Sequence, residues 1–151
     1  MQLSAVRTKD IDAWIAARHY LKSAPAIATL RLEFTDNGQR IGAMLWSRPT
    51  SPKIEQTSIL ELTRMFFIDG TERFVESKAL SMARKHMRKH YPHIKGLIAY
   101  CSTAEGHQGT IYEADGWFKI SQSRSNTGNW ANRPNRQNRD LSIKIKFGRT
   151  P

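Results

Sequence analysis

The sequence predicts a single α/β (α+β) domain over residues 1–151, with a mixed central sheet flanked by helices. Two observations carry this prediction. Strand-like and helix-like patterns alternate along the chain, with a hairpin early and two strands at the end. The apolar runs Ile41–Trp46 and Ile94–Tyr100 are nearly continuous, which is typical of strands buried on both faces. The single cysteine, Cys101, excludes an intrachain disulfide, and 151 residues are enough to bury a core without one.

The expected elements cover most of the chain. Apolar residues at alternate positions predict the first strands, and apolar residues three and four apart predict the first helix, with Thr8 as its cap. Pro25 forbids continuation of that helix, and a turn at 36–38 makes the hairpin. In order, the expected elements are strand Gln2–Arg7, helix Lys9–Leu21, strands Ile27–Thr35, Ile41–Trp46 and Ile59–Ile68, helix Glu72–His90, strand Ile94–Tyr100, a short helix from Thr110 to Gly116, and strands Phe118–Ser123 and Leu141–Phe147.

The strand Ile59–Ile68 is central by composition. Strict alternation places Arg64 on the face of the even-numbered apolar residues, and Glu61 on the opposite face. Charges in a buried strand cost free energy unless they are paired or used. Glu61 and Arg64 are therefore either ion-pair partners at the rim of the sheet or members of a site.

The two later helices have clear ends in the sequence. The short helix begins with Thr110 as a plausible cap and stops at Gly116, the residue that tolerates a left-handed helix end. The long helix has a buried apolar stripe, and charge runs usually form a solvated face. We assign to such a face most of the charge near its C-terminus, where the basic residues are Arg84, Lys85, Arg88 and Lys89.

Net charge is the strongest bulk signal. Lys and Arg number 24 against 13 Asp and Glu, which gives +11 and indicates a polyanionic partner. We favour nucleic acid over a membrane surface, a ribosome or solubility alone. The segment 124–140 is rich in Asn and Arg, which bond phosphates and base edges, around one aromatic residue that can stack on a base. The alternative is a flexible basic loop without an ordered role. The candidate DNA-binding residues are Arg124, Trp130, Arg133, Arg136 and Arg139.

Two stretches are candidate sites on the residues alone. In residues 100–117 a buried strand gives way to a polar loop and a short helix, and a polar loop leaving a buried strand is a common place for a site. The pair His19 and Tyr20 lies at the exit of the first helix. The alternative for this pair is a histidine bonded to a backbone carbonyl and a tyrosine with a packed ring.

Targeting signals are not evident in this sequence. The longest apolar runs are too short to cross a bilayer, and Met1–Asp10 lacks the layout of a signal peptide. We expect a soluble protein of the cytoplasm.

The order of elements resembles the Gcn5-related N-acetyltransferase (GNAT) superfamily. The late segment of that superfamily typically has a buried strand, a loop and a short helix with a Tyr, a Gly and an aromatic residue, here Tyr112, Gly116 and Trp117. The superfamily's acyl-coenzyme-A loop is normally rich in glycine, whereas the corresponding DGTERFVES has one. Bulky side chains keep backbone amides away from a pyrophosphate, so acetyl-CoA is disfavoured as the donor.

A narrower resemblance covers several segments in the right order. The stretches HYLKSAPAIATLRL, GAMLWSRP, LELTRMFFID, KHYPHIKGLIAY and GTIYEADGW are similar to the Mom family of phage DNA-modification proteins, a divergent GNAT-like branch found in phage Mu and its relatives. The resemblance implies transfer of a carbamoylmethyl group to N6 of adenine in double-stranded phage DNA, in the host cytoplasm. This modification blocks host restriction enzymes.

The resemblance also implies the catalytic positions. They are His19 for proton transfer, Tyr20, Arg64 for an anionic donor or phosphate, Ser102, and Tyr112 as acid or orienting group. The family pattern AYAD has an aspartate where this chain has Ser102, so a carboxylate role there would pass to Glu105 or Asp115. The resemblance allows an iron-assisted variant with His19 and Tyr20 as ligands, although the sequence itself shows no metal-binding cluster. The group donor is not identified.

Two other functions stay open. One is an ordinary GNAT N-acyltransferase that uses acetyl-CoA, with Glu61 as the base. The other is a non-catalytic nucleic-acid-binding module on a GNAT scaffold. Turnover and the identity of the donor distinguish the three readings, whereas salt-dependent binding does not.

Overall fold

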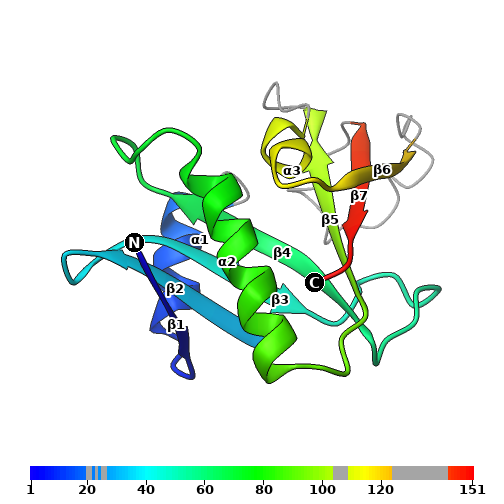
Figure 1. Ribbon diagram of the computed structural model, residues 1–151, viewed down its shortest axis with the longest axis horizontal. Helices are drawn as coiled ribbons and strands as arrows, with labels where there is room; N and C mark the ends of the chain where they lie inside the picture. The colour runs from blue at the N-terminus through cyan, green and yellow to red at the C-terminus, as the bar shows by residue number, and fades with distance from the viewer. Residues whose placement is uncertain (20–21, 23, 25–26, 104–108, 124–142) are drawn as a thin grey trace, which may run out of the picture.

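The computed structural model describes residues 1–19, 22, 24, 27–103, 109–123 and 143–151 (Figure 1). The expected succession of elements is confirmed, with ends that differ by a few residues. The elements are β1 (Gln2–Val6), α1 (Asp10–Arg18), β2 (Leu30–Asp36), β3 (Gln39–Ser47), β4 (Ile59–Phe67), α2 (Val75–His90), β5 (Gly96–Ser102), α3 (Thr110–Ala114), β6 (Phe118–Gln122) and β7 (Lys144–Arg149).

The strands form one mixed sheet, as the sequence predicts. Its seven strands lie in the order β1-β2-β3-β4-β5-β7-β6. The β4–β5 pair is parallel and the other neighbouring pairs are antiparallel. The predicted hairpin is β2–β3, and its turn has left-handed backbone at Asn37 and Gly38, which suits the twist of the strands.

The parallel pair is short, and this divides the sheet into two wings. β4 and β5 are paired only from Ile59 to Leu62 and from Gly96 to Ala99, although both strands continue beyond these residues. Past the last pair, β5 turns away from β4, as Figure 1 shows. We call β1–β4 the first wing and β5, β7 and β6 the second wing.

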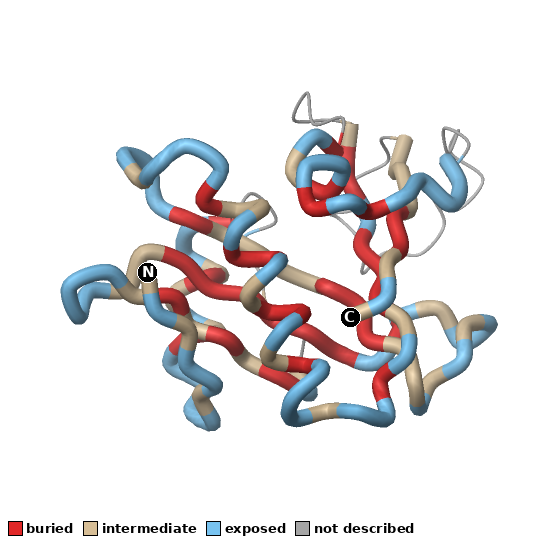
Figure 2. The backbone as a smooth tube through the Cα atoms, in the orientation of Figure 1, coloured by how far each residue is buried: buried red, intermediate tan, exposed pale blue. Residues whose placement is uncertain are grey.

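Helices cover the two faces of the first wing (Figures 1 and 2). α2 packs its apolar stripe, including Leu80 and Met87, on the face that carries Leu32 and Met44. α1 packs Ile11 and Ile15 on Ala43 and Leu45 of the opposite face. We call these the α2 face and the α1 face. In the second wing, α3 packs on the continuation of the α2 face through Tyr112 and Phe147.

A β-bulge in β4 changes the predicted faces. Leu45 lies opposite Arg64 while Trp46 lies opposite Leu62, so Thr63 is an extra residue, and its hydroxyl donates to the Leu45 carbonyl at 2.9 Å. An extra residue shifts the alternation by one. The prediction that Arg64 shares a face with Leu62 is therefore wrong. Arg64 lies on the α1 face, on the same side as Leu45.

Two predictions about helix caps are also wrong. α1 begins after Lys9, and the Thr8 hydroxyl donates to the Asp10 side chain instead of capping the helix. α3 begins after Gly109, which has a left-handed backbone (φ 79°), and Thr110 makes no capping bond. Among the basic residues near the end of α2, Lys85, Arg88 and Lys89 are exposed as expected, whereas Arg84 is buried because Asp115 provides its partner.

Candidate functional site

The site predicted from the sequence centres on the point where β4 and β5 separate. Glu61 lies opposite Ile98 and opposite Ser47, which places it on the α1 face. Arg64 is three residues further along β4 on the same face because of the bulge. Alternation along β5 puts Tyr100 and Ser102 on the face of Ile98. The structure therefore brings the predicted Arg64 and Ser102 to one face, on strands that part between them.

The burial of these side chains favours a site over an ordinary surface. Ser102 is 4% exposed and Glu61 is 7% exposed, whereas Arg64 is half-buried. The guanidinium of Arg64 donates to the carbonyl of Thr63 at 2.6 Å. A cationic group and a hydroxyl held at partly buried strand ends can bind an anion and a polar substrate group.

Glu61 has a specific partner that the sequence did not predict. Its carboxylate accepts hydrogen bonds from the Thr50 backbone N–H at 3.0 Å and from the Thr50 hydroxyl at 2.8 and 2.9 Å. Thr50 lies in the loop between β3 and β4. This loop therefore fixes the orientation of the carboxylate.

Tyr100 is a second residue that the sequence analysis missed as a member of this face. Burial, and then the negative charge of Glu61, raise the pKa of its phenol above 10.0. Tyr100 is still 37% exposed. The signal was available in the sequence, because Tyr100 is two residues before Ser102 and residues two apart share a face of a strand.

His19 lies at the end of α1, as predicted. It is the C-cap residue, its backbone N–H donates to the Ile15 carbonyl at 2.7 Å, and its side chain is buried at 8% exposed. The four-residue spacing continues the stripe Ile11, Ile15 that faces the sheet. His19 is thus carried on the same side of the sheet as Glu61 and Arg64. Tyr20, its predicted companion, lies outside the described residues.

Tyr112 lies on the other side of β5. Its ring stacks on Phe147 (centroids 5.3 Å apart) and meets Trp117 edge-on at 5.4 Å, within the cluster that includes Cys101. Gly109 permits this packing, since a Cβ there would lie 2.2 Å from the Phe147 ring. The structure therefore does not place the ring of Tyr112 on the face of Arg64 and Ser102.

Asp115, one candidate to replace the family aspartate, is engaged by structural partners. Its carboxylate forms two hydrogen bonds with Arg84, at 2.7 and 2.8 Å, and accepts a third from the Trp117 indole at 2.9 Å. All three residues are buried. This group ties α3 to α2. Glu105, the other candidate for that role, lies outside the described residues.

The predicted DNA-binding segment also lies outside the described residues, including Arg124, Trp130, Arg133, Arg136 and Arg139. The described chain ends before it at Ser123 and resumes after it at Ile143. The Ser123 N–H donates to the Lys144 carbonyl and the Lys144 N–H donates to the Ser123 hydroxyl, each at 2.8 Å. A last strand is confirmed as β7, which pairs with β6, and its anchoring of the basic segment stays a prediction.

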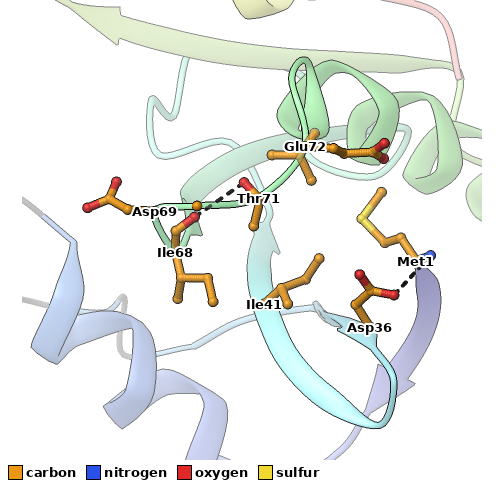
Figure 3. Close-up of a pocket in the computed structure, with 9 residues that line it drawn as sticks. Met1, Asp36, Ile41, Ile68, Asp69, Thr71 and Glu72 are labelled. Atoms are coloured by element: carbon orange, nitrogen blue, oxygen red, sulfur yellow. Dashed lines mark hydrogen bonds and ion pairs between the residues drawn. The ribbon is translucent and has the colours of Figure 1, made fainter.

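The loop between β4 and α2, where the GNAT superfamily binds acyl-coenzyme A, has a different chemistry here. A cavity of about 310 Å³ beside it has Asp36, Asp69 and Glu72 among its lining residues, and the Asp69 carboxylate points away from the other two (Figure 3). Phe74, which precedes α2, is a bulky residue with a left-handed backbone (φ 64°). Asp36 pairs there with the N-terminal ammonium of Met1 at 3.8 Å, and Glu72 pairs with Lys78 at 3.0 Å. Of the predicted catalytic residues that the structure describes, none lines this cavity.

The iron-assisted variant requires a set of metal ligands. Among the described residues no group of three or more His, Cys, Asp or Glu side chains is arranged to hold a metal ion. Of the two implied ligands, only His19 is described. The described residues thus do not supply a ligand set for iron, and we derive no step through it. In the same part of the chain, no helix is long and apolar enough to span a bilayer.

Comparison with solved structures identifies the fold. The ribosomal-protein-S18-alanine N-acetyltransferase of Escherichia coli aligns with 99% of this chain and 92% of its own, at 14% identity and a TM-score of 0.68. The ribosomal-protein-alanine N-acetyltransferase of Brucella melitensis aligns over 100% of both chains, at 10% identity and a TM-score of 0.69. At such identities the likeness shows the fold alone, and the predicted GNAT-like fold is confirmed.

Comparison of sequences identifies the family. The methylcarbamoylase mom of Escherichia phage Mu is 24% identical over 133 residues, which are 80% of this chain. The chain spans about half, 55%, of the length of that relative. The Mom protein family itself matches residues 1–147. The chain therefore belongs to the Mom protein family, and the resemblance drawn from the sequence segments is confirmed.

Proposed function

We propose that this protein is a DNA-modification transferase that adds a carbamoylmethyl group to N6 of adenine in double-stranded phage DNA, in the host cytoplasm, and so protects that DNA from restriction. The match to the Mom protein family across residues 1–147 carries the proposal. The relative from phage Mu is a methylcarbamoylase by name. The net charge of +11 suits a DNA substrate.

The chemistry sets clear demands on the site. The N6 amine is a weak nucleophile because its lone pair is delocalised into the ring, and it is paired inside a duplex, so the base has to leave the stack. In the reaction a bond forms between N6 and the methylene carbon of the donor, the leaving group departs with its electron pair, and N6 loses a proton. A positioned base and a bound donor lower this barrier.

The predicted residues can meet these demands. We assign proton acceptance to His19, binding of an anionic donor or a DNA phosphate to Arg64, and a hydrogen bond to the reacting groups to Ser102. Tyr20 is assigned to the pocket for the adenine. Tyr112 would contribute its hydroxyl from the other side of β5. The shared α1 face of His19, Arg64 and Ser102 supports this assignment.

One observation favours a second candidate function. Glu61 is a buried carboxylate, oriented by Thr50, on the central strand of a GNAT fold. In an ordinary GNAT N-acyltransferase that uses acetyl-CoA, this residue would serve as the base for an amine substrate. A non-catalytic DNA-binding module is the third candidate, supported by the net charge alone.

Nucleoside mass spectrometry on DNA from expressing cells tests the proposal. Wild-type protein should produce a carbamoylmethyl-adenosine species. His19→Ala and Arg64→Ala should each reduce it by about a hundredfold or more, as expected for loss of a general base or of a charged binding group. Matched controls are His90→Ala and Arg88→Ala, which change exposed residues at the end of α2 and should leave the yield unchanged.

The other outcomes assign the alternatives. Unmodified DNA from cells with folded wild-type protein would contradict the proposal. Saturable acetyl-CoA binding by calorimetry, together with acetyl transfer that Glu61→Gln abolishes, would establish the N-acyltransferase. DNA binding without turnover of any donor, unaffected by His19→Ala, would establish the binding module.

A further inference from the structure

The α1 face of the second wing continues from the candidate site to the edge of the sheet. Strand register sets its side chains in rows across β5, β7 and β6. Tyr100 lies opposite Lys146, which lies opposite Ser121. In the next rows Ser102 lies opposite Lys144, and Gly148 lies opposite Phe118. α3 packs on the reverse side, so its aromatic cluster leaves this face uncovered by that helix.

Large apolar side chains on this face are exposed. Phe118 is 61% exposed, Ile120 is 46% exposed and Tyr100 is 37% exposed. The side chain of Ile120 packs over Gly148: a Cβ atom added to this glycine would lie only 2.5 Å from Ile120 Cδ1. Clustered exposed apolar groups on a sheet indicate a binding surface.

The charge of the face identifies the kind of partner. The three strands contain no Asp or Glu. Lys146 lies in the row of Tyr100, next to the row of Phe118, and Lys144 lies in the following row, opposite Ser102. Exposed aromatic rings beside lysines are the composition of surfaces that stack bases and neutralise phosphates. An exposed ring can stack only on a base that is unpaired, since the faces of paired bases are buried in the duplex.

We propose that this face binds the opened, single-stranded segment of DNA next to the target adenine. We call the residues Tyr100, Phe118, Ile120, Lys144 and Lys146 the platform. Phe118 and Tyr100 stack unpaired bases, and Lys146 between them binds a phosphate. The inference rests on the proposed function for the identity of the substrate, and it names where the opened strand lies. Ser102, two residues from Tyr100 on the same face, connects the platform to the site.

A second copy of the chain is the competing occupant, and the charges disfavour it. A twofold contact through this face would bring the lysines of two copies together, with no acidic residue on the three strands to pair with them. A strand of DNA offers both the bases and the phosphates that the platform needs.

Fluorescence anisotropy with a labelled single-stranded oligonucleotide, without any donor, tests the platform. Phe118→Ala should weaken binding roughly fivefold to a hundredfold, the effect of losing one stacked base. Lys146→Gln should weaken binding and lower the salt slope by about 0.7, the contribution of one phosphate contact on a single strand. Matched controls on other surfaces are Phe74→Ala and Lys85→Gln, both at exposed positions, and should bind as the wild type does.

Each result either supports or overturns the inference. Wild-type affinity in both Phe118→Ala and Lys146→Gln, with folding verified by circular dichroism, would overturn it. The inference would also be overturned if analytical ultracentrifugation showed that the wild type is a dimer and that Phe118→Ala is a monomer, while oligonucleotide binding stayed unchanged. Binding is measured without turnover, so the two proposals can fail separately. Wild-type protein that binds the oligonucleotide through the platform but leaves DNA unmodified would count against the proposed function alone. Wild-type protein that modifies DNA, but whose oligonucleotide binding is unchanged by Phe118→Ala and Lys146→Gln, would count against the platform alone.

Discussion

Asp115 and Glu61 are both buried carboxylates, and their neighbours give them different roles. Asp115 has Arg84 as a bidentate partner and the Trp117 indole as a third, so its hydrogen-bonding capacity serves the structure. Glu61 has Thr50, a neutral donor in a loop, and lies beside an exposed tyrosine. Residue types alone do not separate these cases, because the partners are distant in sequence.

Asp115→Ala should therefore destabilise the fold. Its removal leaves the Arg84 guanidinium buried without its carboxylate, which costs about 3 to 5 kcal/mol of unfolding free energy. Urea denaturation measures this. The control Glu72→Ala breaks an exposed ion pair with Lys78 and should cost about 1 kcal/mol or less. Equal losses in the two variants would show that the Asp115 pair is not the structural tie described above.

The proximity of Tyr100 and Glu61 can be tested by titration. Both burial and the Glu61 charge raise the pKa of Tyr100, so Glu61→Gln should move it back toward its usual value near 10.0. The folded state holds this proton more tightly than the unfolded state, so the stabilisation is complete below about pH 10 and is lost as pH rises through the folded pKa. Phenolate absorbance, with Tyr100→Phe to identify the transition, measures the shift. An unchanged transition in Glu61→Gln would place the two groups apart.

At the scale of elements, the spacing of apolar residues predicted those helices and strands that keep a regular repeat. The hairpin, the position of the central strand and the buried stripe of α2 from Val75 to Met87 are confirmed. The bulge at Thr63 was not predicted, because it arises from a register shift of β4 against β3 that the sequence of β4 alone does not encode. That single residue decides which face Arg64 occupies.

The first residues of the helices were also not fixed by residue type alone. The sequence offered Thr8 and Thr110 as caps, whereas backbone geometry at Lys9 and Gly109 opens the two helices. For the site, the sequence and its family resemblance supplied His19, Arg64 and Ser102. They could not supply Thr50, because a loop partner is defined only once β3 and β4 are paired.

At the scale of the whole molecule, the two wings meet at one joint, to which the Arg84–Asp115 pair and a shared hydrophobic cluster contribute. The β4–β5 pairing spans four residue pairs, and Trp46 of the first wing stacks on Trp117 of the second at 6.5 Å. Both rings are buried, at 0% and 4% exposed. The predicted catalytic residues are divided between the wings, with Arg64 on β4 and Ser102 on β5. Their relative position therefore depends on this joint.

Trp117→Ala should loosen the joint. Loss of a buried tryptophan costs about 3 to 5 kcal/mol, and the loss falls on the contact between the wings. Amides of β6 and β7 should then exchange with deuterium faster than those of β2 and β3, because the second wing opens first. Trp117→Phe, which keeps an aromatic ring but removes the bond to Asp115, should show a smaller effect. Trp14→Ala is the control in the first wing, where the ring packs on Phe66 of β4 and has no contact with Trp46 or Trp117 in the described structure. If exchange rises equally in β2, β3, β6 and β7 of Trp117→Ala, the wings unfold as one unit, and the position of Arg64 relative to Ser102 is set by the whole core instead of by the joint.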